Sequence, residues 1–136
     1  MPIAGLCQKW HNTAMDASDK PLFWISSALD ELREFPDEVK RIMGFALRQA
    51  QAGGKQVDAK PLRGLGGAGV LEIVEDHDGN TYRTIYTVEF TGAVYVLHAF
   101  QKKSTRGRST AQRDIDLVVE RLKRAAEHYA DWRKGR

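Results

Sequence analysis

The sequence contains few of the features that mark secreted, membrane-spanning or metal-binding proteins. Its single cysteine, Cys7, excludes an internal disulfide framework and fits a reducing cytoplasm. No stretch approaches the roughly 18 consecutive apolar residues that a membrane-spanning helix needs. The 4 histidines stand far apart, without the paired spacing of a zinc site, so we expect neither a bound metal nor another cofactor. These absences predict a cytoplasmic protein.

The first part of the chain shows no regular hydrophobic pattern. Residues 1–19 also lack the basic segment and the long apolar core of a signal peptide. We interpret them as a flexible N-terminal tail, and Met15 is an alternative start. The remaining residues, 20–136, have the length of one domain.

Hydrophobic periodicity divides the domain into strands and helices. Short apolar or alternating segments predict four strands, and apolar residues at helical spacing predict three helices. The strands are Pro21–Ser26, Val70–Glu75, Thr81–Glu89 and a segment that starts at Val94; the helices begin near Ser27, Pro36 and Asp114. The order β-α-α-β-β-β-α, with three strands joined by short turns, predicts an α+β fold in which helices pack on a small antiparallel sheet.

The segment Gly64–Gly69 matches the letters of a dinucleotide-binding motif, G-x-G-x-x-G. That motif binds a pyrophosphate only where it follows a strand and opens a helix. Here it precedes a strand, so we exclude a dinucleotide site. The glycines instead allow a sharply turning connector.

The segment Val94–Arg108 carries the clearest functional signal. It begins as an apolar strand and ends in four cations: Lys102, Lys103, Arg106 and Arg108. Strict alternation along that strand predicts that His98, Phe100 and Lys102 share one side with Val94 and Val96. Such a cationic strand end suits a bound polyanion, because lysine and arginine neutralise phosphate charge. The alternative is a solvated loop with no ligand.

Other polar residues leave two interpretations open. His98 is either a general acid or base beside the cations or a hydrogen-bonded histidine packed in the sheet. Arg83 either forms a cross-strand ion pair with Glu72 or binds phosphate through its planar guanidinium group.

Lys60 and Arg63 add a second basic segment. Three tyrosines give the sheet aromatic character, and one of them could stack on a base: Tyr82, Tyr86 and Tyr95.

Taken together, these segments resemble the RelE/ParE toxin superfamily, in particular its HigB-like, phage-derived branch of type II toxins. The resemblance covers the chain from about Pro21 to Ala130. Its most specific elements are K-x-L-x-G at Lys60–Gly64, the pair Leu71-Glu72, the pair Tyr82-Arg83 and F-x-K-K at Phe100–Lys103. The order of the predicted helices and strands agrees with the compact RelE-like fold.

This resemblance implies the toxin of a type II toxin–antitoxin system. Such a toxin is a metal-independent endoribonuclease, or mRNA interferase, that cleaves mRNA in the ribosome and inhibits translation. The ribose 2′-OH attacks the adjacent phosphorus and leaves a 2′,3′-cyclic phosphate. A cognate antitoxin, usually a helix-turn-helix protein in the HigB-like branch, holds the toxin inactive.

By position, the resemblance assigns phosphate neutralisation to Arg83, Lys102 and Lys103. It assigns RNA binding to the basic connector, Lys60 and Arg63, and we add Arg106 and Arg108 because they continue the cationic strand end. His98 is the candidate for proton transfer, with Tyr86 as the substitute.

Two other functions fit the same fold. Some superfamily members act as ParE-like poisons of DNA gyrase, and fold alone does not decide between the two targets. The chain could also be a non-toxic remnant that binds only RNA or an antitoxin.

Overall fold

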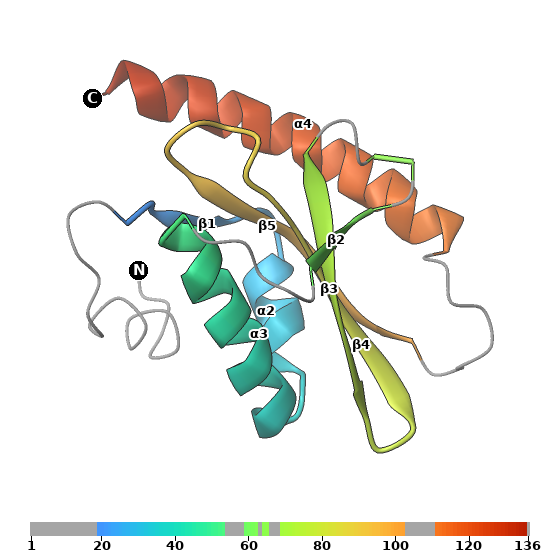
Figure 1. The fold of residues 1–136 in the computed structure, drawn as a ribbon. Helices are drawn as coiled ribbons and strands as arrows, with labels where there is room; N and C mark the ends of the chain where they lie inside the picture. Colours follow the sequence, from blue (N-terminus) through green and yellow to red (C-terminus); the bar gives the residue numbers. More distant parts are fainter. Residues whose placement is uncertain (1–18, 54–58, 63, 66–68, 103–110, 136) are drawn as a thin grey trace.

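The computed structural model describes residues 19–53, 59–62, 64–65, 69–102 and 111–135. Within these ranges the chain forms a five-stranded sheet with three helices packed on it (Figure 1). In chain order the elements are β1 Leu22–Trp24, α2 Ala28–Arg33, α3 Asp37–Gln51, β2 Ala59–Pro61, β3 Val70–His77, β4 Asn80–Thr87, β5 Val94–Lys102 and α4 Gln112–Lys134.

The sheet confirms the predicted α+β class and adds two features to it. Its strand order is β1-β5-β4-β3-β2, and β3, β4 and β5 form the predicted antiparallel meander. The short edge strand β2, which pairs with β3, was not predicted because three residues are too few to show alternation. β1 runs parallel to β5, so the sheet is mixed where we expected an antiparallel one.

The turn between β3 and β4 follows from two residues. Asp78 and Gly79 both have positive φ, 51° and 79°, which is the backbone of a two-residue type I′ turn. Aspartate and glycine tolerate this conformation better than other residues. The predicted short turn between these two strands is therefore confirmed, and it fixes the register of β3 against β4.

The sheet buries a different hydrophobic core on each face. Helices α2 and α3 cover one face, where Leu32, Met43 and Leu47 pack against Ile73 and Val96. Helix α4 covers part of the other face (Figure 1), where a second core forms. That second core contains Ile85, Tyr95, Leu97, Val118 and Ala125.

Helix α4 packs most of its apolar face on the sheet, as its helical spacing predicted. Val118 is buried, and Leu122 and Tyr129 pack against the second core. Arg121 and Ala125 are also buried, whereas Ala126 is exposed. The apolar pattern could not predict the burial of Arg121, because arginine is usually exposed. Within the described ranges, none of the helices has the length and apolar character needed to cross a membrane.

A β-bulge in β5 changes the side on which His98 lies. Ile85 of β4 pairs with His98, but the next residue, Tyr86, pairs with Val96, so Leu97 is an extra residue. Val96 faces the core under α2 and α3, whereas Phe100 packs into the core under α4. The prediction that both lie on one side was wrong, because it assumed unbroken alternation.

Gly69, where the connector enters β3, is a position that requires glycine. Its φ is +75°, and a β-carbon added there would lie 3.0 Å from the Cβ of Glu89. We expect Gly69→Ala to lower the free energy of unfolding by about 1–3 kcal/mol, measured by urea denaturation. Gly53→Ala is the matched control, because Gly53 has a φ of +87° but nothing within 4 Å of the added atom. Equal losses in the two variants would show that the contact with Glu89 costs nothing.

Candidate functional site

The strand registers bring several polar residues together on the face of the sheet that α4 partly covers. Every second side chain of a strand points to the same face, and the side chains of paired residues on neighbouring strands form rows across that face. One row contains Lys60, Glu72, Ile85 and His98, the next Val74, Arg83 and Phe100, and the third Asp76, Thr81 and Lys102. We call the polar members of these rows, with Phe100, the α4-facing surface: Lys60, Glu72, Asp76, Thr81, Arg83, His98, Phe100 and Lys102.

Arg83 is the buried cation of this surface. It is 6% exposed, and its Nη1 lies 2.6 Å from Oε2 of Glu72, one row away on β3. The predicted cross-strand ion pair is therefore present. The same guanidinium group belongs to the surface that carries Lys102, so the structural and the phosphate-binding interpretations of Arg83 are compatible.

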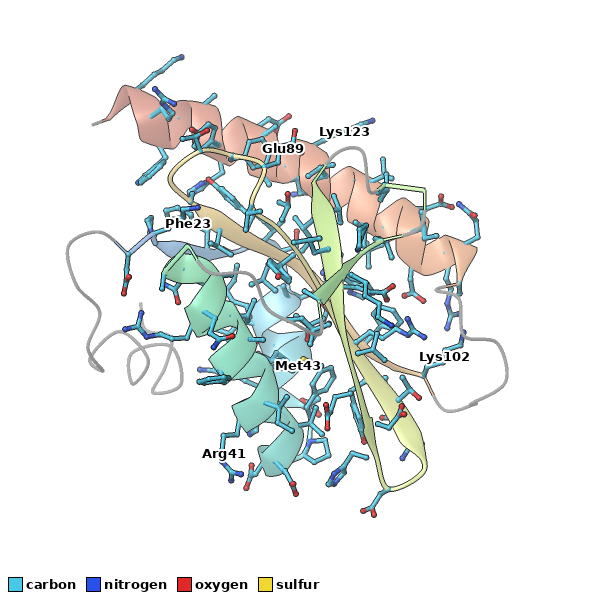
Figure 2. The ribbon with its side chains drawn as sticks, in the orientation of Figure 1. Phe23, Arg41, Met43, Glu89, Lys102 and Lys123 are labelled. Carbon is cyan, nitrogen blue, oxygen red and sulfur yellow. The ribbon has the colours of Figure 1, made fainter. Side chains whose placement is uncertain are left out.

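Two lysines lie on the same surface as Arg83. Lys102, the last residue of β5, lies opposite Thr81, whose hydroxyl donates to Asp76 at 2.9 Å. Figure 2 shows Lys102 at the outer end of β5, on the opposite side of the molecule from Phe23. Lys60 is exposed on the edge strand β2, directly opposite Glu72. The sheet thus brings together cations from β2, β4 and β5.

Four predicted site residues lie outside the described residues. They are Lys103, Arg63, Arg106 and Arg108. Their assignment to phosphate or RNA binding stays a prediction.

His98 occupies a buried position between two carboxylates. It is 5% exposed, with Nδ1 2.9 Å from Oε1 of Glu31 and Nε2 2.9 Å from Oδ1 of Asp114. Its ring also stacks on Phe100, with centroids 4.7 Å apart. Both ring nitrogens are therefore engaged within the protein, as the interpretation of a packed, hydrogen-bonded histidine predicted.

Glu31 connects three elements of the fold. Its carboxylate accepts hydrogen bonds from the backbone N–H of Ala99 and from Arg121, in addition to contacting His98. Burial alone would raise the pKa of Glu31, but the hydrogen bonds from His98, Arg121 and Ala99 outweigh it and lower the pKa to about 2. The bond to Ala99 satisfies an edge N–H of β5 beyond the end of β1.

Arg121 completes this network and was missed by the sequence analysis. Its guanidinium group contacts Glu31 at 3.0 Å and Ser27 at 3.0 Å, and it donates to the carbonyl of Leu97 at 2.9 Å. Leu97 is the extra residue of the bulge, so Arg121 satisfies the backbone where the sheet ladder is interrupted. Of the five residues of this network, His98 and Arg121 are buried. We call Ser27, Glu31, His98, Asp114 and Arg121 the Glu31 network.

This network predicts a loss of stability in acid. Because the pKa of Glu31 falls from 4.5 to about 2 on folding, its stabilising effect is complete above pH 4.5 and disappears as the pH falls toward 2. We expect the wild-type protein to lose about 3 kcal/mol in this window through Glu31. Urea denaturation at several pH values should show a flatter profile for Glu31→Gln and an unchanged one for the control Glu120→Gln. Parallel profiles for wild type and Glu31→Gln would contradict the assignment.

Tyr86 lies on the other face of the sheet. It is 2% exposed in the core beneath α2 and α3, and burial raises its pKa to about 12. Tyr82 and Tyr95 are also buried, at 6% and 0% exposure. The structure therefore separates Tyr86 from Arg83 and Lys102, and the three tyrosines are part of the two cores.

Comparison with known proteins identifies the family. The sequence pattern of the family described as "Phage derived protein Gp49-like" matches residues 30–123. A comparison with curated proteins gives no match.

Two solved structures match the chain. One is the Escherichia coli toxin RelE, a double mutant in the free state, with 19% sequence identity, a TM-score of 0.51, and coverage of 78% of this chain and 97% of that one. The other is the toxin–antitoxin complex RelBE2 of Mycobacterium tuberculosis, with 19% identity and a TM-score of 0.38, covering 67% of this chain and 100% of that one. The likeness to RelE concerns the fold. The chain therefore belongs to the phage-derived, Gp49-like family, and its fold is similar to that of the toxin RelE.

Proposed function

We propose that the protein is the toxin of a type II toxin–antitoxin system and cleaves mRNA on the translating ribosome, in the cytoplasm. The observation that supports this most strongly is the position of Arg83. A guanidinium group that is 6% exposed is held mid-strand by Glu72, on the surface that also carries Lys60 and Lys102. A fixed planar cation with two lysines on the same surface suits a phosphate group.

The proposed reaction needs cations where negative charge develops. The ribose 2′-oxygen attacks the adjacent phosphorus, and the bond from phosphorus to the 5′-oxygen breaks. The 2′-OH proton passes to a base, and the leaving oxygen takes up a proton, which yields a 2′,3′-cyclic phosphate and a 5′-OH. Arg83 and Lys102, with Lys103 from the adjoining segment, stabilise the charge on the pentacovalent phosphorus. No metal takes part.

The geometry favours a positioning role for His98 over proton transfer. Its two nitrogens already contact Glu31 and Asp114, and the side chain is 7% exposed. Tyr86 is buried in the core on the opposite face of the sheet, so its hydroxyl group does not reach the α4-facing surface. The proposal therefore depends on the cations of the α4-facing surface, while His98 fixes the surroundings of Phe100.

The proposed partners are an mRNA bound to the ribosome and a cognate antitoxin, of the helix-turn-helix type. Lys60, with Arg63, Arg106 and Arg108, would contact the RNA backbone. Such contacts make binding salt-dependent, because each neutralised phosphate releases counterions.

A reconstituted translation reaction tests the proposal. Purified protein is added to ribosomes that translate a defined mRNA, and the product ends are analysed by ligation and phosphatase sensitivity. We expect cleavage within the coding sequence that leaves a 2′,3′-cyclic phosphate and a 5′-OH. Intact mRNA in a reaction whose translation the protein inhibits would contradict the proposal.

A further inference from the structure

Phe100 is the aromatic residue of the α4-facing surface, and His98 covers one face of its ring. The two residues are neighbours on the same side of β5, with ring centroids 4.7 Å apart and an angle of 22° between the ring planes. The next residue on that side, toward the strand end, is Lys102. The ring is partly exposed, so it is not wholly enclosed by the core beneath α4.

The imidazole behind Phe100 is held rigidly. Glu31 from α2 and Asp114 from α4 each lie 2.9 Å from one ring nitrogen, which fixes both the position and the plane of His98. Two half-buried carboxylates thus support the imidazole ring on which the partly exposed Phe100 stacks. A rigid aromatic surface loses little conformational entropy when a flat ligand stacks on it.

Two cations lie near Phe100 on the same face of the sheet. Arg83 lies directly opposite Phe100 on β4, and Lys102 lies two residues further along β5. A nucleotide combines a flat base with an anionic phosphate, and proteins bind single strands by stacking the base and neutralising the phosphate. The three tyrosines of the sheet are buried, which leaves Phe100 as the aromatic ring beside the cations.

We propose that Phe100, supported by His98, is a stacking platform for a nucleobase of the RNA whose phosphate Arg83 and Lys102 bind. This inference rests on the proposed function and extends it from phosphate binding to recognition of a base. Phe100 is then a contact residue for the substrate, and His98 is a positioning residue.

Fluorescence of a labelled RNA tests this contact directly. The probe is a short single-stranded RNA with one 2-aminopurine and with 2′-O-methyl groups, which remove the nucleophile and allow binding without cleavage. We expect wild-type protein to quench the probe, because stacking on an aromatic ring quenches 2-aminopurine. Phe100→Leu should abolish the quenching and weaken binding about tenfold, which corresponds to about 1.4 kcal/mol. Phe100→Tyr should retain both.

Phe90→Leu is the matched control. Phe90 also packs into the core beneath α4, but it contacts Tyr95 and Tyr129, away from the α4-facing surface. The Phe90→Leu variant should quench the 2-aminopurine probe and bind the RNA like the wild-type protein. Equal losses for Phe90→Leu and Phe100→Leu would attribute the effect to core packing and overturn the inference.

A second measurement holds even if Phe100→Leu fails to fold. Phe100→Trp places an indole on the surface, and addition of unlabelled RNA should change its fluorescence beyond the change seen in the wild-type protein. The same change in fluorescence for Phe100→Trp and the wild-type protein would overturn the inference that Phe100 stacks on a base.

The outcomes also separate this inference from the proposed function. If Phe100→Leu binds and quenches like the wild type while wild-type protein cleaves mRNA, the platform is wrong and the nuclease stands. Absence of cleavage by the wild type refutes the proposed function itself. If Phe100→Leu loses antitoxin binding but binds RNA like the wild type, Phe100 contacts the antitoxin, and the inference is also overturned.

Discussion

Arg83→Ala is expected to abolish growth inhibition and to lower the rate of mRNA cleavage by on the order of 10²–10³-fold. The physical reason is that removing a single fixed donor to a developing anion has effects of this size in other enzymes. The measurement is colony formation after induced expression, together with cleavage in the reconstituted translation reaction.

The design must separate lost chemistry from lost stability. Arg83→Ala leaves the carboxylate of Glu72, which is 13% exposed, without its partner at 2.6 Å, and such a charge is destabilising. The double variant Glu72→Gln with Arg83→Gln removes both charges and avoids this cost. Arg124→Ala on the exposed side of α4 is the matched control for loss of one positive charge. A folded double variant with wild-type toxicity would show that Arg83 has no role in the reaction.

Arg121→Ala is expected to give the largest loss of stability, about 3–5 kcal/mol. The substitution removes the charged guanidinium partner of the half-buried Glu31 carboxylate and leaves the buried carbonyl of Leu97 unsatisfied. Since proteins of this size are stable by about 5–15 kcal/mol, this loss is a large share of the total. Urea denaturation at neutral pH measures it directly.

Two comparisons make the Arg121 result specific. Arg124→Ala, on the same helix but with a side chain that is 60% exposed, should change stability by no more than about 0.5 kcal/mol. Replacing Glu31 and Arg121 together by Gln and Met should recover part of the loss, because no unpaired charge remains. A loss below about 1 kcal/mol for Arg121→Ala would contradict the importance of the Glu31 network for stability.

Local patterns predicted most of the fold. Helix α3 follows its apolar stripe, with Val39, Met43 and Leu47 buried, and the D-G turn joins β3 to β4 as expected. These features depend on neighbours within a few residues, which a sequence displays directly. The pairing of Glu72 with Arg83 could be predicted from the sequence for the same reason, since both lie in one predicted hairpin.

Features that depend on distant contacts were not predictable. Glu31 contacts His98 and Arg121, which are 67 and 90 residues away in the sequence. Arg121 stands among other charged residues and looks like part of a solvated helix face. The bulge at Leu97 has no local signature, so unbroken alternation placed His98 on the wrong side of the sheet.

Mapping of transcript ends in cells tests the central claim most directly. Wild-type protein and the Glu72→Gln/Arg83→Gln variant are expressed separately, and primer extension locates new 5′ ends on abundant transcripts. We expect new ends within coding regions for the wild type and none for the variant. Growth arrest with intact transcripts and DNA breaks would contradict the account and indicate a gyrase poison, and absence of arrest would indicate a non-toxic remnant.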